Sequence, residues 1–175
     1  TVKILTGLLP PASGTASVCG FDILKEPVEV KKRTGYVPES GALYESLTPY
    51  EYLKTVGLLY ELPVDTIELR IAEYLKFFNV ADQMHNPMIE FSKGMKQKII
   101  ITSALMHDPD VLILDEPLNG LDVQAVNDFK ALLKQFSQSG KTIFYSSHLL
   151  EVVETICDYI IILDQGNLLA QGAIT

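Results

Sequence analysis

Hydrophobic and polar positions follow two different periods along this chain. From Val111 to Leu114 four aliphatic residues run directly into Asp115 and Glu116. A short, wholly apolar run that ends in charge is typical of a fully buried parallel strand. We also expect strands near residues 34–38, 143–147 and 159–163, and shorter extended segments at 15–19 and 168–171.

Between residues 48 and 106 the pattern changes to the helical period. Thr48 and Glu51 form a capping box around Pro49, and Leu47 and Tyr52 occupy the positions of a hydrophobic staple. A second helix is expected to open at an Asp65 cap, and a third to cover 92–105. The apolar positions of the second helix share one face: Ile67, Ile71, Leu75 and Phe78.

The end of a helix is expected at 2–9, stopping near Gly7, and a loop at 10–14. After the 111–116 segment, Asp122 can cap a helix whose inner side carries Val126, Phe129, Leu133 and Phe136. Another helix is expected at 149–156. From residue 111 to residue 163, predicted strands alternate with predicted helices. This order predicts a parallel sheet with right-handed crossovers. We therefore expect an α/β core formed by 1–47 and 107–175, with an all-helical subdomain, 48–106, inserted into it.

Composition narrows the functional classes. The chain has 175 residues, 47% of them hydrophobic and 21% charged, which fits one globular domain. A formal net charge of -8 argues against a nucleic-acid partner, because binding phosphates non-specifically needs Lys and Arg. Cys19 and Cys157 form neither a disulfide framework nor a metal-ligand spacing. No apolar stretch has transmembrane length, so we expect any membrane role to come through a partner.

Two carboxylates and a histidine follow neighbouring predicted strands. Ligands of open α/β sheets bind at the carboxyl ends of the strands. There one of the two carboxylates, Asp115 or Glu116, can hold Mg²⁺ and the other can polarise a water. His148 ends the next strand, within reach of a terminal phosphate on the same site. Each feature alone fits a structural role equally well, since many buried strands end in a solvated turn.

Three further segments carry weaker signals. Ser92, Lys93 and Gly94 open a helix, where backbone N–H groups and the helix dipole favour phosphate, although an ordinary N-cap with a basic turn fits too. Asp122 fits both a cap and a ligand contact. Glu39 is a carboxylate directly after a strand that stops at Pro38.

Taken in order, these segments resemble the nucleotide-binding domain of ATP-binding-cassette proteins over essentially the whole chain. The correspondences are a variant signature sequence at 92–97, a Walker B strand at 111–116, a D-loop at 120–122, a switch histidine at His148 and a Q-loop position at Glu39. The resemblance implies a P-loop NTPase (RecA-like) α/β fold and the cofactors ATP and Mg²⁺.

The resemblance also implies roles for individual residues. Glu116 is the general base and His148 contacts the γ-phosphate, so these two form the catalytic pair. Asp115 and Glu39 are the Mg²⁺ ligands. Glu39 contacts the nucleotide of the same chain. The signature residues Ser92, Lys93 and Gly94 contact the nucleotide of the second chain in a head-to-tail dimer. Asp122 couples the two nucleotide sites.

The chain departs from the family in one major respect. A P-loop reads G-x-x-x-x-G-K-[ST] between a strand and a helix, and no such match exists. Gly140-Lys141-Thr142 lacks the earlier glycine and follows a predicted helix. We therefore expect the chain to begin just after the P-loop, with the preceding strands missing and the chain inactive alone. Glu39 also replaces Gln, and Phe91 and Lys93 replace Leu and Gly.

These variants resemble the ATPase subunits of bacterial exporters and permease-type efflux systems. The implied function is ATP hydrolysis that drives export, and the implied location is the cytoplasmic face of the membrane. The implied partners are a transmembrane permease and a second nucleotide-binding domain, which is identical to this one or different from it. Two alternatives stay open: a soluble ATPase of the same family without a membrane subunit, and an interaction module with no activity.

Overall fold

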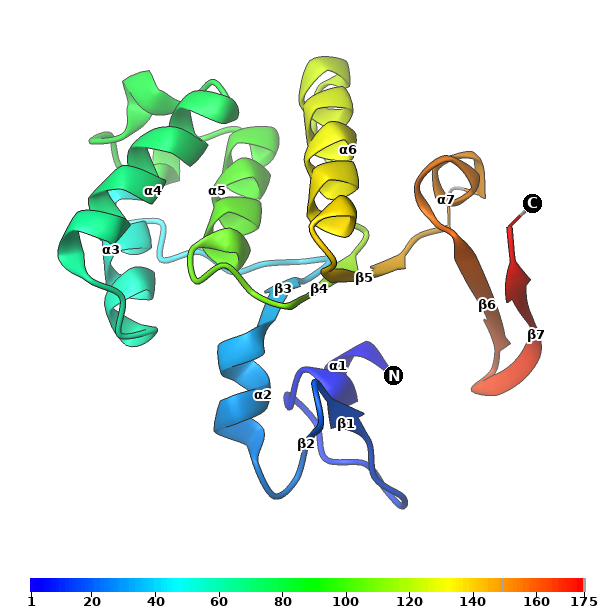
Figure 1. Ribbon diagram of the computed structural model, residues 1–175. Coiled ribbons are helices and arrows are strands. Elements are labelled where there is room, and N and C mark those ends of the chain that lie inside the picture. The colour runs from blue at the N-terminus through cyan, green and yellow to red at the C-terminus, as the bar shows by residue number, and fades with distance from the viewer. Residues whose placement is uncertain (149, 175) are drawn as a thin grey trace.

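A three-stranded parallel sheet lies at the centre of the chain (Figure 1). The computed structural model describes residues 1–148 and 150–174. The strand order is β3-β4-β5, with Val37 opposite Leu114 and Asp115 opposite Ser146. All three carboxyl ends therefore meet at one edge, as expected. The strands are β3 (Thr34–Val37), β4 (Val111–Asp115) and β5 (Thr142–Ser146).

Helices cover both faces of this sheet. Figure 1 shows α5 (Lys93–Leu105) and α6 (Val123–Gln138) on one side, and α1 (Val2–Leu5) and α2 (Pro27–Arg33) on the other. The approach of α5 to β3 is close enough to require Gly35, because a Cβ there would lie 2.3 Å from the Ala104 carbonyl oxygen. Helix α2 was not anticipated from the sequence.

Every regular element between β3 and β4 is a helix. It contains α3 (Pro49–Leu59), α4 (Val64–Phe77), α5 and two 3₁₀ turns, Ala81–Gln83 and Met88–Glu90. The capping box of α3 is confirmed: the Glu51 amide donates to Thr48 Oγ1 (3.2 Å) and the Thr48 amide to the Glu51 carboxylate (2.9 Å).

The expected start of α4 at Asp65 is wrong. Pro63 is the N-cap, and its carbonyl accepts the Ile67 amide at 3.0 Å, so the helix begins at Val64. Asp65 lies inside the first turn, and its side chain makes no capping hydrogen bond. The carbonyl of an N-cap residue accepts the first hydrogen bond of the helix, and Pro63 does so without a side-chain cap.

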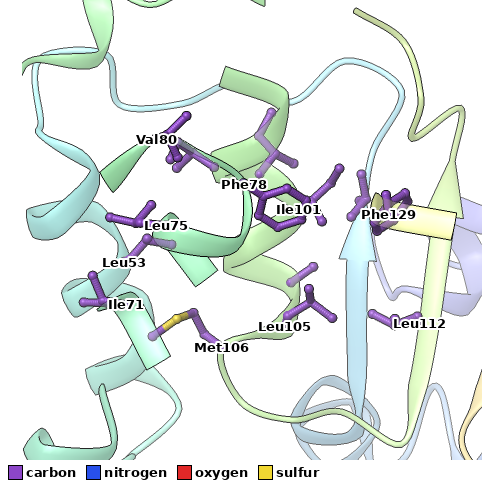
Figure 2. Packing of buried hydrophobic residues seen from close by; sticks show 14 of the residues in the cluster. Leu53, Ile71, Leu75, Phe78, Val80, Ile101, Leu105, Met106, Leu112 and Phe129 are labelled. Carbon is purple, nitrogen blue, oxygen red and sulfur yellow. The ribbon is translucent and has the colours of Figure 1, made fainter. Parts of the chain in front are cut away.

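One continuous core joins the helices to the sheet (Figure 2). The predicted apolar face of the second helix, α4, is confirmed. Its four residues, Ile67, Ile71, Leu75 and Phe78, are each at most 2% exposed. On α6, Phe129 and Leu133 are fully buried, whereas Val126 and Phe136 are partly buried. Figure 2 shows Leu53, Leu75, Phe78 and Ile101 converging from three helices. A smaller cluster under α2 contains Val18, Ile23 and Val30.

Two hairpins lie outside the central sheet. At the N-terminal end, β1 (Ser17–Val18) lies within the predicted 15–19 strand and pairs with β2 (Phe21–Asp22). At the other end, α7 (Leu150–Ile156) leads into β6 (Tyr159–Asp164) and β7 (Asn167–Ala173). The predicted first residue of α7, Leu149, lies outside the described residues.

The prediction that the 159–163 strand extends the parallel sheet is wrong. Strand β6 pairs antiparallel with β7 and, within residues 1–148 and 150–174, with no strand of the central sheet. The turn accounts for the β6–β7 pairing: Gln165 and Gly166 both have positive φ, 46° and 83°, which is the backbone of a tight two-residue hairpin. Large apolar side chains of this hairpin are exposed, including Ile161, Leu168 and Leu169.

A buried histidine ties α3 to the sheet. The His107 ring stacks on Tyr60 at the end of α3, with ring centroids 3.8 Å apart, and its Nε2 lies 3.2 Å from the Thr34 carbonyl oxygen. Nε2 carries the proton, because a carbonyl only accepts. Burial is the main reason that the pKa of His107 falls from 6.5 to about 4.

We expect this histidine to make the fold acid-sensitive. Because its folded-state pKa lies below its unfolded value, its contribution to stability is complete above pH 6.5 and is lost as the pH falls towards 4. The loss should reach about 2 kcal/mol at pH 4.5. Urea unfolding at pH 7 and 4.5 measures it, with His107→Phe as the reference because it keeps the stacking and cannot titrate.

At pH 7 the variant should be less stable by about 1 kcal/mol, from the lost hydrogen bond. At pH 4.5 that difference should vanish or reverse. A difference between the two proteins that stays constant across this range would contradict the role given to His107.

Candidate nucleotide site

The central strand delivers two carboxylates to the open edge of the sheet. Asp115 is the last residue of β4, and Glu116 follows it with φ +47°, in the left-handed region that a side chain rarely occupies. The Glu116 amide donates to the Ser146 carbonyl at 3.0 Å, which continues the β4–β5 pairing by one residue. This bond holds the turn and points the Glu116 side chain toward the loop that follows β5.

Three donors converge on the Glu116 carboxylate. Its Oε1 accepts the His148 backbone amide at 2.9 Å and lies 2.8 Å from His148 Nδ1, while its Oε2 accepts the Ser147 hydroxyl at 3.2 Å. Since a carboxylate only accepts, the Nδ1 atom carries the proton. The Glu116 side chain is 16% exposed and the histidine 71% exposed, so the imidazole projects outward from an anchored carboxylate.

The second carboxylate has its own partner on the neighbouring strand. The Ser146 hydroxyl donates to Asp115 Oδ1. Burial, with the Asp115 charge as a lesser cause, raises the pKa of Tyr36 on β3. Burial and then the Glu116 charge raise the pKa of Tyr145 to about 12. Both phenols are therefore neutral beside the acidic pair at pH 7.

Glu39 lies at the same edge of the sheet. It follows β3 by two residues, and Val37 at the end of β3 pairs with Leu114. Its side chain is exposed, and no hydrogen bond or ion pair of the described residues involves it. The structure thus places Glu39 on the expected side without joining it to Asp115.

The signature segment forms the start of α5. Ser92 is its N-cap, and the Ser92 hydroxyl accepts the Met95 amide at 3.2 Å, so the predicted cap is confirmed. Ser92 and Lys93 are exposed. A Cβ at Gly94 would lie 2.4 Å from the Gly120 carbonyl oxygen, so the helix start and the 116–122 loop touch backbone to backbone.

Asp122 caps α6, as predicted. Its Oδ1 accepts the Ala125 amide at 2.8 Å and its Oδ2 lies 3.1 Å from Lys98 Nζ. The Ala125 hydrogen bond, followed by that from Lys98, lowers the pKa of Asp122. The carboxylate therefore stays ionised and joins α5 to the start of α6.

The predicted residues therefore form two groups. Asp115, Glu116 and His148 meet at the ends of β4 and β5, whereas the signature residues Ser92 and Gly94 lie beside the 116–122 loop. Over residues 1–148 and 150–174, no hydrogen bond or ion pair joins the signature residues to the two carboxylates. Gly140 and Lys141 connect α6 to β5, after a helix as expected: φ of Gly140 is +84°, and the Lys141 side chain pairs with Asp108.

The carboxylates at this edge can supply only part of the coordination shell of Mg²⁺. No group of three or more His, Cys, Asp or Glu side chains in the described chain could hold a metal ion. Protein-bound Mg²⁺ usually takes one or two carboxylates and fills its shell with phosphate oxygens and water. Asp115 fits that limited role.

Sequence reasoning missed three residues around the site. Ser146 and Tyr36 flank Asp115 from the two neighbouring strands, and Gln97 is buried on α5, where it donates to the Pro117 carbonyl. For Ser146 a signal was available, because it ends the strand beside Asp115. For Gln97 the signal was its place as the last residue of the 92–97 signature segment, in which only Ser92, Lys93 and Gly94 received a role.

None of the described helices is both long and apolar enough to cross a membrane. Residues 1–119 match the family described as ABC transporter. The chain is 40% identical to the ABC transporter ATP-binding protein NatA of Bacillus subtilis, over 99% of this chain and 71% of the relative. It is 40% identical to the linearmycin resistance ATP-binding protein LnrL of the same organism, over 100% of this chain and 56% of the relative.

Solved structures agree with these sequence relatives. An ATP-binding subunit of an ABC transporter superposes with a TM-score of 0.93 at 32% identity, over 99% of this chain and 72% of that one. A dimeric ATP-binding cassette in a post-hydrolysis state with ADP and Pi matches in fold, with a TM-score of 0.89 at 20% identity, over 99% of this chain and 79% of that one. The predicted α/β fold of the P-loop NTPase type is confirmed, and the chain belongs to the ATP-binding-cassette (ABC) transporter family.

Proposed function

We propose that this chain carries the hydrolytic half of an ABC transporter ATPase site, which uses Mg²⁺-ATP to drive export of a substrate through a membrane permease. The observation that carries the proposal is the Glu116 carboxylate, held by three donors at the carboxyl edge of a parallel sheet. A fixed carboxylate beside a second one and an exposed imidazole is the arrangement that activation of a water against a phosphate requires.

Each residue at this edge has a distinct task. Glu116 accepts the proton of the attacking water, and its three donors fix the direction of its oxygens. His148 donates its Nδ1–H to the Glu116 carboxylate and presents the opposite edge of its ring, which carries Nε2, to the γ-phosphate. Asp115, fixed by Ser146, holds Mg²⁺ together with Glu39; when bound, that ion neutralises charge on the phosphate oxygens. Positioning and charge neutralisation supply most of the rate in phosphoryl transfer.

The signature residues act on a second nucleotide-binding domain in this proposal. Ser92 and Lys93 are exposed at the N-terminus of α5, where unpaired backbone amides favour an anion. Ser92, Lys93 and Gly94 therefore close on ATP bound to a second copy, identical or not, in a head-to-tail dimer, and Asp122 couples the two sites. Among the residues that the structure describes, no hydrogen bond or ion pair joins Ser92, Lys93 or Gly94 to the two carboxylates, which supports this division.

The helical segment 48–106 is the subdomain that docks the permease, and the loop after Glu39 transmits its movement to the nucleotide. The assembly then lies on the cytoplasmic face of the membrane. Export is the direction we favour, because relatives with 34% identity are named Nod factor export ATP-binding proteins. A soluble ATPase of the same family and an inactive interaction module are the competing outcomes of the tests below.

The main test compares Mg²⁺-ATP hydrolysis by this chain with hydrolysis by a version extended upstream through the expected P-loop. We expect turnover only in the extended form. In that form Glu116→Gln should lower kcat by at least about 100-fold while ATP stays bound, because the general base is lost and the shape is kept. Phosphate release measures kcat, and retention of nucleotide with the protein on a filter measures ATP binding.

Glu154→Gln, an equally conservative change of an exposed glutamate on α7, is the matched control and should keep the wild-type rate. No turnover in either chain length would leave only an interaction module. If the Glu116→Gln variant hydrolysed ATP near the control rate, Glu116 would not be the general base.

The dimer proposal is tested at Ser92. In the extended chain carrying Glu116→Gln, ATP should produce a dimer that light scattering coupled to size exclusion detects. Ser92→Trp should abolish that dimer and leave ATP binding by the monomer within about twofold, because the bulky ring blocks only the facing surface.

Ser137→Trp places the same ring on an exposed position near the end of α6 and should leave the dimer intact. Equal dimer fractions in both tryptophan variants would show that Ser92 does not face the second domain.

A further inference from the structure

A buried carboxamide connects the signature helix to the catalytic turn. Gln97 lies on α5, is 6% exposed, and its Nε2 donates to the Pro117 carbonyl at 3.0 Å. A buried polar side chain without a partner destabilises a fold, so a paired one at this depth fixes both groups that it joins. Pro117 follows Glu116 directly, so the bond reaches within one residue of the proposed general base.

The turn that receives this bond is also held by hydrogen bonds of its own and by the sheet. Inside it, the Asn119 amide donates to the Glu116 carbonyl at 3.2 Å and the Leu121 amide to the Leu118 carbonyl at 3.1 Å. On the sheet side the Glu116 amide is held by Ser146. The turn is therefore held from the sheet at Glu116 and from the helix at Pro117, and its strained φ at Glu116 lies between the two holds.

Neighbours of Gln97 extend the connection in two directions. The next residue, Lys98, pairs with Asp122 at 3.1 Å, and Gly94 touches Gly120, so the same loop is held at two more points. The preceding residue, Lys96, pairs with Glu45 at 2.7 Å.

Glu45 belongs to the loop that follows Glu39, and this loop also packs against α5. A Cβ at Gly41 would lie 2.5 Å from Ile100 Cδ1. Three consecutive side chains of α5 thus bind the loop after β3 and the loop after β4.

We propose that Gln97 is a positioning residue for hydrolysis: its carboxamide fixes the Glu116 turn to α5, so that a displacement of α5 or of the loop carrying Glu45 reorients the general base. The proposal rests on the hydrolytic role of Glu116 given above. A neutral donor suits the position, because a carbonyl must be satisfied in a buried site where a charge would be costly.

The test replaces Gln97 with methionine, which keeps the length and removes the donor. In the extended chain kcat should fall by about 10- to 100-fold, because a displaced general base loses its alignment with the water. The KM for ATP should stay within about twofold, since among the described residues the Gln97 side chain hydrogen-bonds to the Pro117 carbonyl and to none of the residues proposed to bind ATP. A purely structural role would instead lower the melting temperature and leave kcat per folded molecule unchanged.

A second variant keeps the shape and makes the donor titratable. Gln97→Glu has no donor when ionised and regains one when protonated, and burial raises the pKa of a carboxyl. Its kcat relative to wild type should therefore be low at pH 8 and recover towards pH 6. Lys54→Met is the control for Gln97→Met: it breaks an ion pair with Glu68 (2.9 Å) elsewhere in the helical segment and should leave kcat unchanged.

Hydrogen exchange on the present chain tests the connection without any activity. In Gln97→Met, exchange of the Asn119 and Leu121 amides should rise about tenfold, as expected for the loss of one hydrogen bond, and the control should match wild type. Unchanged kcat and unchanged exchange would overturn the proposal. If the extended wild type proves inactive, the hydrolytic assignment fails, and the exchange experiment still decides whether Gln97 holds the turn.

Discussion

The site depends on one hydrogen bond that continues the β4–β5 pairing past the end of β4, from the Glu116 amide to the Ser146 carbonyl. Regular pairing ends at Asp115, and the next residue takes a left-handed conformation that only a fixed environment maintains. This bond brings the end of β4 against the end of β5. Ser146 at the end of β5 then lies within hydrogen-bonding distance of Asp115, and Ser147 and His148 after it lie within hydrogen-bonding distance of Glu116, so the same contact brings these five residues together.

The core explains why that edge is rigid. Helix α5 packs so closely on β3 that Gly35 leaves no room for a Cβ, and the same helix touches Gly120 through Gly94. Two backbone-to-backbone contacts at opposite ends of one helix leave little freedom for it to slide. Since Phe129 and Leu112 fill the space between α6 and the sheet, the sheet and both helices form one body to which the polar groups are attached.

Local sequence signals predicted the features that local chemistry determines. The Thr48 box, the Ser92 and Asp122 caps and the buried 111–114 strand depend on neighbours within a few residues, and each was found as expected. Partners of β6, of Gln97 and of His107 come from distant segments, and no short pattern identifies them. The Asp65 error has a different origin: side-chain capping was assumed where a proline carbonyl begins the helix. The roles of the site residues stay predictions, supported by geometry and by family membership.

The β6–β7 hairpin has a consequence for the colloidal behaviour of the chain. Leu169 is 64% and Leu168 54% exposed, and over residues 1–148 and 150–174 neither strand of the hairpin pairs with a third strand. Exposed apolar side chains and unpaired strand edges are features through which proteins associate. A net charge of -8 keeps molecules apart near neutral pH. That repulsion disappears near the isoelectric point of about 4.8, which lies in the range where His107 gains its proton. Acid therefore removes the electrostatic barrier and loosens the fold together, and precipitation rather than reversible unfolding is the natural end state of the chain in that range.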